Sequence, residues 1–171
     1  MLSAMFIAIG IVLPFFTGQI QQIGSMLCPM HIPVLLTGFI CGWKYGLIVG
    51  FILPISRSVF FGMPIMYPFA LAMAFELATY GFVSGYLYNK SRWKCVKALL
   101  RCLIISMISG RIVWGIVQMI LLGIKGGSFT LSMFISGAFL NAIPGIIIQI
   151  ILIPVLMVSL HKAKFVRFGR K

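Results

Sequence analysis

The sequence predicts an all-α integral membrane protein in which six transmembrane helices cross the bilayer and both termini are cytoplasmic. Of its 171 residues, 61% are hydrophobic and only 9% are charged, whereas a soluble domain carries about 25% charged residues. A soluble chain of this length would leave much of its apolar surface in water, because small domains bury only about 60–70% of their unfolded surface. Lipid around the helices removes this conflict.

Six apolar stretches account for nearly the whole chain. A bilayer core about 30 Å thick needs about 20 helical residues, although shorter stretches also occur. The stretches are residues 2–16, 31–43, 45–61, 66–88, 98–123 and 131–160. The second and third stretches result from dividing one long apolar run at Lys44. We expect Pro144 and Pro154 to interrupt the sixth stretch. We therefore expect residues 1–171 to form one six-helix transmembrane domain.

The basic residues predict the orientation of these helices. Six crossings place both ends on one side, together with the second and fourth connections. Eleven of the 14 Lys and Arg residues then fall on that side: Lys44, Lys90, Arg92, Lys94, Lys97, Arg101, Lys162, Lys164, Arg167, Arg170 and Lys171. The positive-inside rule assigns this side to the cytoplasm. The net charge of +13 is thus interpreted as a topology signal rather than as a nucleic-acid surface.

Glycines recur every four residues across the predicted second and third helices. They are Gly38, Gly42, Gly46 and Gly50. One interpretation is a stripe of small residues that allows close helix contact. The alternative is that the middle two only form the turn between the helices.

Three ionisable residues lie away from the basic ends. Glu76 is the only acidic residue of the chain and falls near the middle of the fourth stretch, at a depth similar to that of Arg111 in the fifth. Intramembrane charges normally face the bundle interior and pair, so we expect these two to form an ion pair with either a functional or a packing role. Arg57, at the outer end of the third stretch, either binds an anionic group or extends to the interface.

Further polar and aromatic residues are candidates for lining an outward-facing pocket. Trp114 and Gln118 share a helical face with Arg111, and Tyr80 shares one with Glu76. The other candidates are Gln19, Gln22, His31, Tyr67 and Asn141. For each, the alternative is an ordinary interhelical hydrogen bond; for His31 it is an amphipathic helix-end position at the interface.

Several kinds of chemistry are excluded or disfavoured. There is no phosphate-binding Walker loop and no HExxH motif. With no aspartate and one glutamate, paired-carboxylate catalysis is excluded, and we predict that the protein is not an enzyme and has no catalytic residues. The two histidines are far apart and none of the four cysteines forms a CxxC pair, so we expect neither a metal site nor a cofactor.

The chain resembles the substrate-binding membrane subunits, or S components, of energy-coupling factor (ECF) vitamin transporters. The resemblance covers the whole chain in size and plan and is densest in MLCPMHIPVLLTGFICGWKYG, LPISRSVFFGMPIMYP and AMAFELATYG. A second mark is Ala4-Met5-Phe6-Ile7-Ala8, which matches the AxxxA pattern by which S components dock onto a coupling protein. Two small residues on one helical face allow another helix to approach closely.

The resemblance implies a substrate-capture subunit of an ATP-driven importer in the prokaryotic cell membrane. Such a subunit binds a vitamin or precursor on the outer side and docks, here through Ala4 and Ala8, onto a transmembrane coupling protein with two cytoplasmic ATPases. In the family, the pocket is built from the outer halves of the last three helices and three connections, the regions that hold the candidate residues named above. Arg57 and Arg111 would suit a carboxylate such as that of pantothenate; a nucleoside-like or cobamide precursor stacking on Trp114 and Tyr67 is the other possibility. Two alternatives to transport stay open: a structural or assembly protein without ligand, and an intramembrane enzyme.

Overall fold

A computed structural model describes residues 1–14, 29–62, 64–91, 93–124, 143–162 and 169–170. Within these ranges the chain forms six α-helices: α1 (Leu2–Val12), α3 (His31–Cys41), α4 (Trp43–Phe61), α5 (Leu71–Lys90), α6 (Val96–Ile124) and α8 (Ile143–Lys162). A π-helical turn, η2 (Met66–Ala70), leads directly into α5. The strands β1 (Trp93–Lys94) and β2 (Gly169–Arg170) form one short antiparallel pair. The predicted all-α class is therefore confirmed.

Four of the helices are long and apolar enough to cross a membrane. They are α4, η2 with α5, α6 and α8, with 19, 25, 29 and 20 residues. The helices α1 and α3 have 11 residues each, which corresponds to about 16 Å of helix. Helix α1 ends four residues before the predicted end of the first stretch. The orientation relative to the cytoplasm stays a prediction.

Two predicted interruptions differ from the structure. The break between α3 and α4 falls at Gly42 and not at Lys44, because Gly42 has a φ of 95° that favours glycine over other residues. Lys44 is already in the first turn of α4. Pro154 was expected to interrupt the last helix, but α8 continues through it, and Pro144 sits in its first turn, where a proline is well tolerated.

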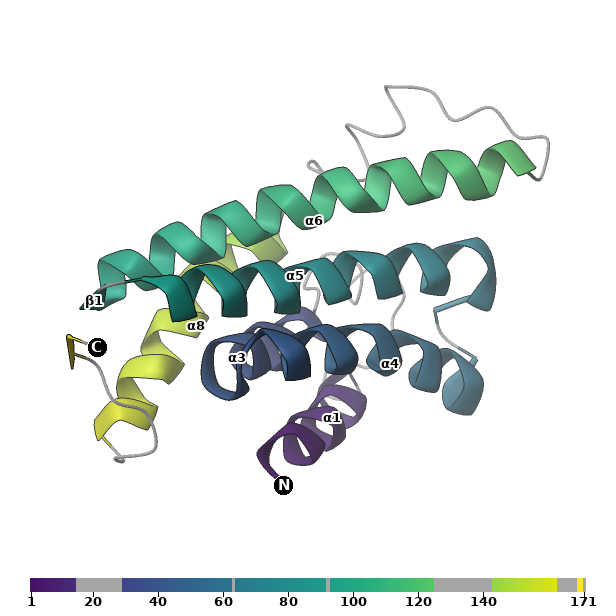
Figure 1. Cartoon of the computed structure of the whole chain (residues 1–171). Coiled ribbons are helices and arrows are strands. Elements are labelled where there is room, and N and C mark those ends of the chain that lie inside the picture. The colour runs from purple at the N-terminus through teal and green to yellow at the C-terminus, as the bar shows by residue number, and fades with distance from the viewer. Residues whose placement is uncertain (15–28, 63, 92, 125–142, 163–168, 171) are drawn as a thin grey trace.

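Helix α5 is the centre of the bundle. It packs against α3, α4 and α6, while α1 lies against α3 and α4, and α8 against α3 and α6. In Figure 1, α4, α5 and α6 run alongside one another and α8 crosses near the end at which β1 lies. The central helix therefore brings its side chains within reach of most other elements.

Close packing around α5 depends on glycine. A Cβ added to Gly46 would lie 2.6 Å from the carbonyl oxygen of Gly81, and one added to Gly38 would lie 2.7 Å from the same oxygen. No real side chain tolerates such contacts with backbone atoms, so the backbones of α3, α4 and α5 touch. Each interpretation of the glycine pattern is thus correct for some of the glycines. Gly42 forms the turn, whereas Gly38, Gly46 and Gly50 form the contact surface.

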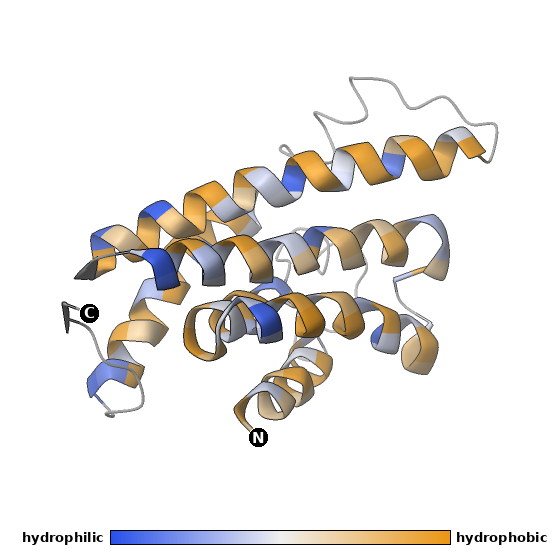
Figure 2. Cartoon of the chain, in the orientation of Figure 1, coloured by the Kyte–Doolittle hydropathy of each residue, from blue (hydrophilic) through white to orange (hydrophobic). Residues whose placement is uncertain are grey.

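The outer surface of the bundle is apolar and the cations gather at one end. Figure 2 shows hydrophobic ribbon along most helices, with isolated hydrophilic segments midway along α5 and α6. Gly85 near the end of α5 lies against Trp43, which places the α3–α4 turn beside the α5–α6 connection. The pairing of β1 with β2 brings the chain after α8 to the same end. We call this end the cationic end. It carries Lys44 in the first turn of α4, Lys90 at the end of α5, Lys97 and Arg101 in the first turns of α6, and Lys162 at the end of α8.

Candidate functional site

A cluster of polar side chains surrounds the single carboxylate of the chain. The Oε1 atom of Glu76 accepts a hydrogen bond from the Tyr80 hydroxyl at 2.8 Å and lies 3.1 Å from Nη1 of Arg111. The Nε2 atom of His31 lies 3.6 Å from the same oxygen. We call these four residues, which come from α3, α5 and α6, the polar cluster. The expected pairing of Glu76 with Arg111 is confirmed.

The cluster is closed off from the surface of the bundle. His31, Glu76, Tyr80 and Arg111 are 1%, 2%, 0% and 7% exposed. At such burial an unpaired charge is costly, on the order of 2.5–3.5 kcal/mol at the bilayer centre on insertion scales. The pairing of Glu76 with Arg111 lowers this cost for both groups, which accounts for their similar depth.

Helical spacing and one glycine give the cluster its geometry. Tyr80 follows Glu76 by four residues on α5, so both side chains lie on one face. Gly110, beside Arg111 on α6, faces the ring of Tyr80, and a Cβ at position 110 would overlap that ring. Glycine at this position therefore lets α6 approach closely enough for Arg111 to reach Glu76.

His31 corrects one interpretation of the sequence. An amphipathic position at the membrane interface was considered for it, but the side chain is buried, with its ring centroid 5.1 Å from that of Tyr80. Its place at the start of α3 suggested the interface because sequence position alone does not show that α3 begins inside the bundle. The contact with Glu76 is made across the bundle and has no local sequence signal.

Arg57 links two helices rather than reaching the interface. It is 5% exposed, and its Nη1 donates a hydrogen bond of 3.1 Å to the carbonyl oxygen of Ile11 in the last turn of α1. Carbonyls in the last turn of a helix have no partner within that helix. The guanidinium also lies 5.9 Å from the ring centroid of Phe61. Extension of Arg57 to the interface is therefore wrong, and its role toward an anionic ligand stays a prediction.

The predicted aromatic candidates lie on the helices that surround the cluster. The Tyr67 hydroxyl donates to the carbonyl oxygen of Leu121 near the end of α6, which fastens η2 to that helix. Trp114 is partly buried on α6, on the same side as Arg111 and Gln118, as the spacing predicted.

Two buried glutamines carry unused hydrogen-bonding capacity. Gln118 on α6 is 3% exposed and Gln149 on α8 is 1% exposed. Within the described residues, neither side-chain carbonyl oxygen has a hydrogen-bond partner. An unmade hydrogen bond of this kind costs about 1–3 kcal/mol. Gln149 was not among the sequence candidates, although it is the one polar residue in the run from Ile146 to Ile153 and could have been found by that signal.

The remaining predicted residues divide into exposed and undescribed positions. Ala4 and Ala8 both lie on an exposed side of α1, next to the exposed Met5 and Ile9. Gln19, Gln22 and Asn141 lie outside the described residues. The described side chains include no group of three potential metal ligands.

Comparison with known proteins gives one match. The family model described as "ECF transporter, substrate-specific component" matches residues 1–157. Neither a curated protein nor a solved structure matches the chain.

Proposed function

Because the chain belongs to the family of ECF transporter substrate-specific components, we propose that it captures a small solute for import. The solute is a vitamin or vitamin precursor, bound on the outer side of a prokaryotic cell membrane. The observation that carries this proposal is a set of buried polar groups in a largely apolar bundle. It consists of the polar cluster and of the Gln118 and Gln149 oxygens, which have no hydrogen-bond partner among the described residues. The family is one of transport subunits rather than enzymes.

The two glutamines indicate how a solute would be held. Each buried amide oxygen accepts a hydrogen bond, so an O–H or N–H group of a ligand would satisfy either one. Their helices, α6 and α8, pack on each other. A ligand hydrogen bond to either oxygen recovers free energy that the unoccupied protein lacks, which favours polar, uncharged groups in the ligand.

The balance of buried charge favours a ligand with one negative charge. Among the described side chains, Arg57 and Arg111 are buried cations and Glu76 is the buried anion. One positive charge is therefore in excess, and a ligand carboxylate would balance it. Pantothenate has one carboxylate together with hydroxyl and amide donors, and it is our first candidate. Nucleoside-like and cobamide precursors are the alternatives.

Delivery would require docking onto partner proteins. The exposed side of α1 at Ala4 and Ala8 is apolar and small, which permits close approach of a helix from a transmembrane coupling protein. We propose that two cytoplasmic ATPases attached to that protein supply the energy.

The test is to identify the small molecules that co-purify with the detergent-solubilised protein by mass spectrometry. One vitamin-like compound in near-equimolar amount, with affinity reduced in the Gln118→Leu and Gln149→Leu variants, would support capture. A preparation without ligand that also binds none of the candidate vitamins would favour a structural or assembly role. Conversion of a bound compound by the purified protein would favour an intramembrane enzyme.

Docking is tested separately by uptake. Ala4→Trp and Ala8→Trp should abolish uptake by cells that carry the coupling module while leaving solute binding intact. The control is Ile116→Trp, which places the same side chain on an exposed apolar face of α6. Normal uptake with both alanine variants would contradict docking through α1 without bearing on solute capture.

A further inference from the structure

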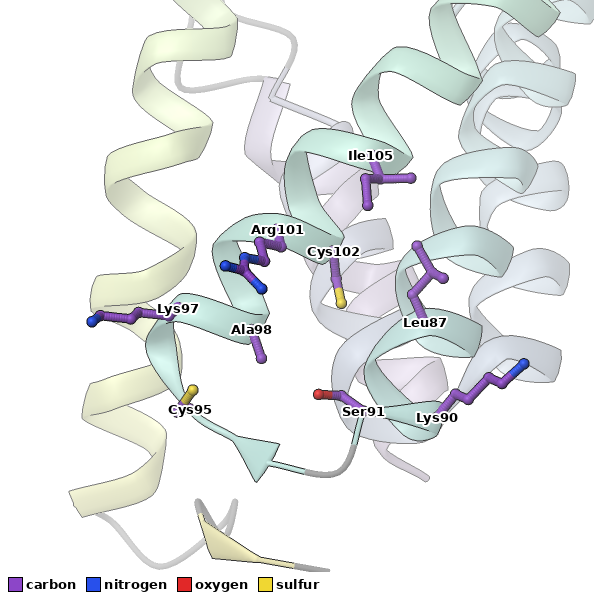
Figure 3. A pocket seen from close by; sticks show the side chains of 9 residues that line it. All are labelled: Leu87, Lys90, Ser91, Cys95, Lys97, Ala98, Arg101, Cys102 and Ile105. Atoms are coloured by element: carbon purple, nitrogen blue, oxygen red, sulfur yellow. The ribbon is translucent and has the colours of Figure 1, made fainter.

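A pocket of about 470 Å³ lies at the cationic end, far from the polar cluster. It is formed by the last turn of α5, the connection and the first turns of α6 (Figure 3). Nine residues line it: Leu87, Lys90, Ser91, Cys95, Lys97, Ala98, Arg101, Cys102 and Ile105. We call it the basic pocket.

The cations of the basic pocket lie far from the only acidic side chain of the chain. Figure 3 shows Arg101 between Lys97 and Lys90, whose side chains point outward on opposite sides of the pocket. Glu76 is the only acidic residue of the chain. It precedes Lys90 by 14 residues on α5, which is about 21 Å along the helix. Glu76 is therefore too far away to be the counter-charge of these three cations, which leaves them open to an anionic ligand.

An apolar track continues from the basic pocket along α6. Ile105 lines the pocket, and Ile108, Ile112 and Ile116 follow it at spacings of three and four residues. All four side chains are about half exposed. Such spacing places them on one helical face. From Ile105 to Ile116 the track is about 16 Å long, close to half of a bilayer core of about 30 Å.

We propose that the basic pocket binds an anionic phospholipid of the cytoplasmic leaflet. The guanidinium of Arg101 contacts the phosphate, because its fork of donors matches two phosphate oxygens. Lys97 and Lys90 add positive charge at the sides, and one acyl chain lies along the isoleucine track. Cations at one end of an apolar track one leaflet long fit a phospholipid better than an acidic protein, which would leave the track unused. The proposal goes beyond solute capture and is independent of which solute is bound.

The experiment compares the full chain in vesicles of phosphatidylcholine with vesicles that also contain phosphatidylglycerol. The first readout is the lipid retained by the protein in native mass spectrometry. The second is the rate of maleimide labelling at Cys95, which is exposed and lines the pocket. We expect selective retention of phosphatidylglycerol and slower labelling of Cys95 in its presence.

Two double variants distinguish lipid binding in the pocket from general attraction of a basic protein to an anionic membrane surface. Arg101→Gln with Lys97→Gln should weaken phosphatidylglycerol retention about 25-fold, at about fivefold for each cation. Lys44→Gln with Lys162→Gln removes the same charge from the cationic end outside the pocket and should leave retention and labelling nearly unchanged. All four positions are exposed, so the variants are expected to fold, and thermal melting checks this.

Three results would overturn the proposal. One is equal retention of both lipids, and another is an equal loss of retention in the two double variants. The third is protection of Cys95 by something other than lipid. Protection by inorganic phosphate to the same extent would assign the pocket to a soluble anion, and protection only in the presence of the coupling protein would assign it to an acidic partner.

Discussion

Arg101 and Arg111 lie on the same helix but have opposite surroundings. Arg111 is buried and lies 3.1 Å from the carboxylate of Glu76. Arg101 is exposed and lines a pocket in which no acidic side chain of the chain can lie, because Glu76 is the only one. The difference follows from where the single acidic residue is placed.

This contrast shows which cations of a membrane chain with a net charge of +13 require a counter-charge within the protein. A buried cation requires an internal partner, because neither water nor lipid headgroups reach it. Cations at the helix ends are solvated by water and headgroups and require none. The one carboxylate is therefore used inside the bundle, and the exposed cations of the cationic end are left to water, ions and lipid headgroups.

The largest effect on stability is expected from removing Glu76, the internal counter-charge of Arg111. Glu76→Gln leaves Arg111 buried without its counter-charge, and we expect a loss of about 3–5 kcal/mol of stability. Thermal melting of the purified protein in detergent measures this loss. Arg111→Met should have a similar effect, because it leaves the carboxylate unpaired.

The double variant Glu76→Gln with Arg111→Met is the control for this pair. It removes both charges, so its loss of stability should be smaller than the sum of the two single losses. Simple additivity of the two losses, or an unchanged melting temperature for Glu76→Gln alone, would show that the pair does not hold the bundle together.

A smaller effect is expected from disturbing the geometry of the cluster without changing its charge. Gly110→Ala places a methyl group against the Tyr80 ring and should cost about 1–3 kcal/mol by overpacking. Gly123→Ala on the same helix is the matched control, since no atom of the described residues lies within 4 Å of a Cβ there. Alanine is the better helix former, so the control should be neutral or slightly stabilising. Equal melting temperatures for the two variants would contradict the contact.

Much of the fold was predictable because apolar length and glycine spacing are local properties. All six predicted stretches contain a described helix, and the first residue of α3 and the last of α4 match the prediction. The break at Gly42 was misplaced because a charged residue was given more weight than a residue that tolerates positive φ. The end of α1 at Val12 was not predicted either, whereas the second stretch was expected to be short, as α3 is.

The site was predictable only in part, because most of its contacts are not local in the sequence. Glu76 and Arg111 could be paired from sequence because each is a rare charge at a similar depth in an apolar helix. The contact of His31 with Glu76 depends on how α3 packs on α5. Gln149 stands out as a polar residue in an apolar run, but its burial depends on where α8 packs. Contacts set by tertiary packing leave no spacing pattern within one helix.

Gln118 should separate stability from ligand binding. Gln118→Leu replaces a buried amide oxygen, which has no hydrogen-bond partner among the described residues, by an apolar group of similar size. The free energy of unfolding should therefore change by less than about 1 kcal/mol or rise. Ligand affinity should fall about tenfold if one hydrogen bond to the solute is lost. Melting curves with and without the identified ligand measure both quantities. Unchanged affinity would remove Gln118 from the binding site.

The smallest effect on stability is expected from giving the basic pocket a carboxylate of its own. Ser91→Glu places an acidic group among the cations that line the pocket, where an exposed ion pair contributes only about 0–1 kcal/mol. Retention of phosphatidylglycerol should nevertheless fall, because the new carboxylate replaces the lipid phosphate as counter-charge and repels it. Ser91→Gln has nearly the same shape without the charge and should retain the lipid. If both variants retain phosphatidylglycerol equally, the lack of an internal acidic partner is not what draws an anion to Arg101, and the contrast with Arg111 has no consequence for binding.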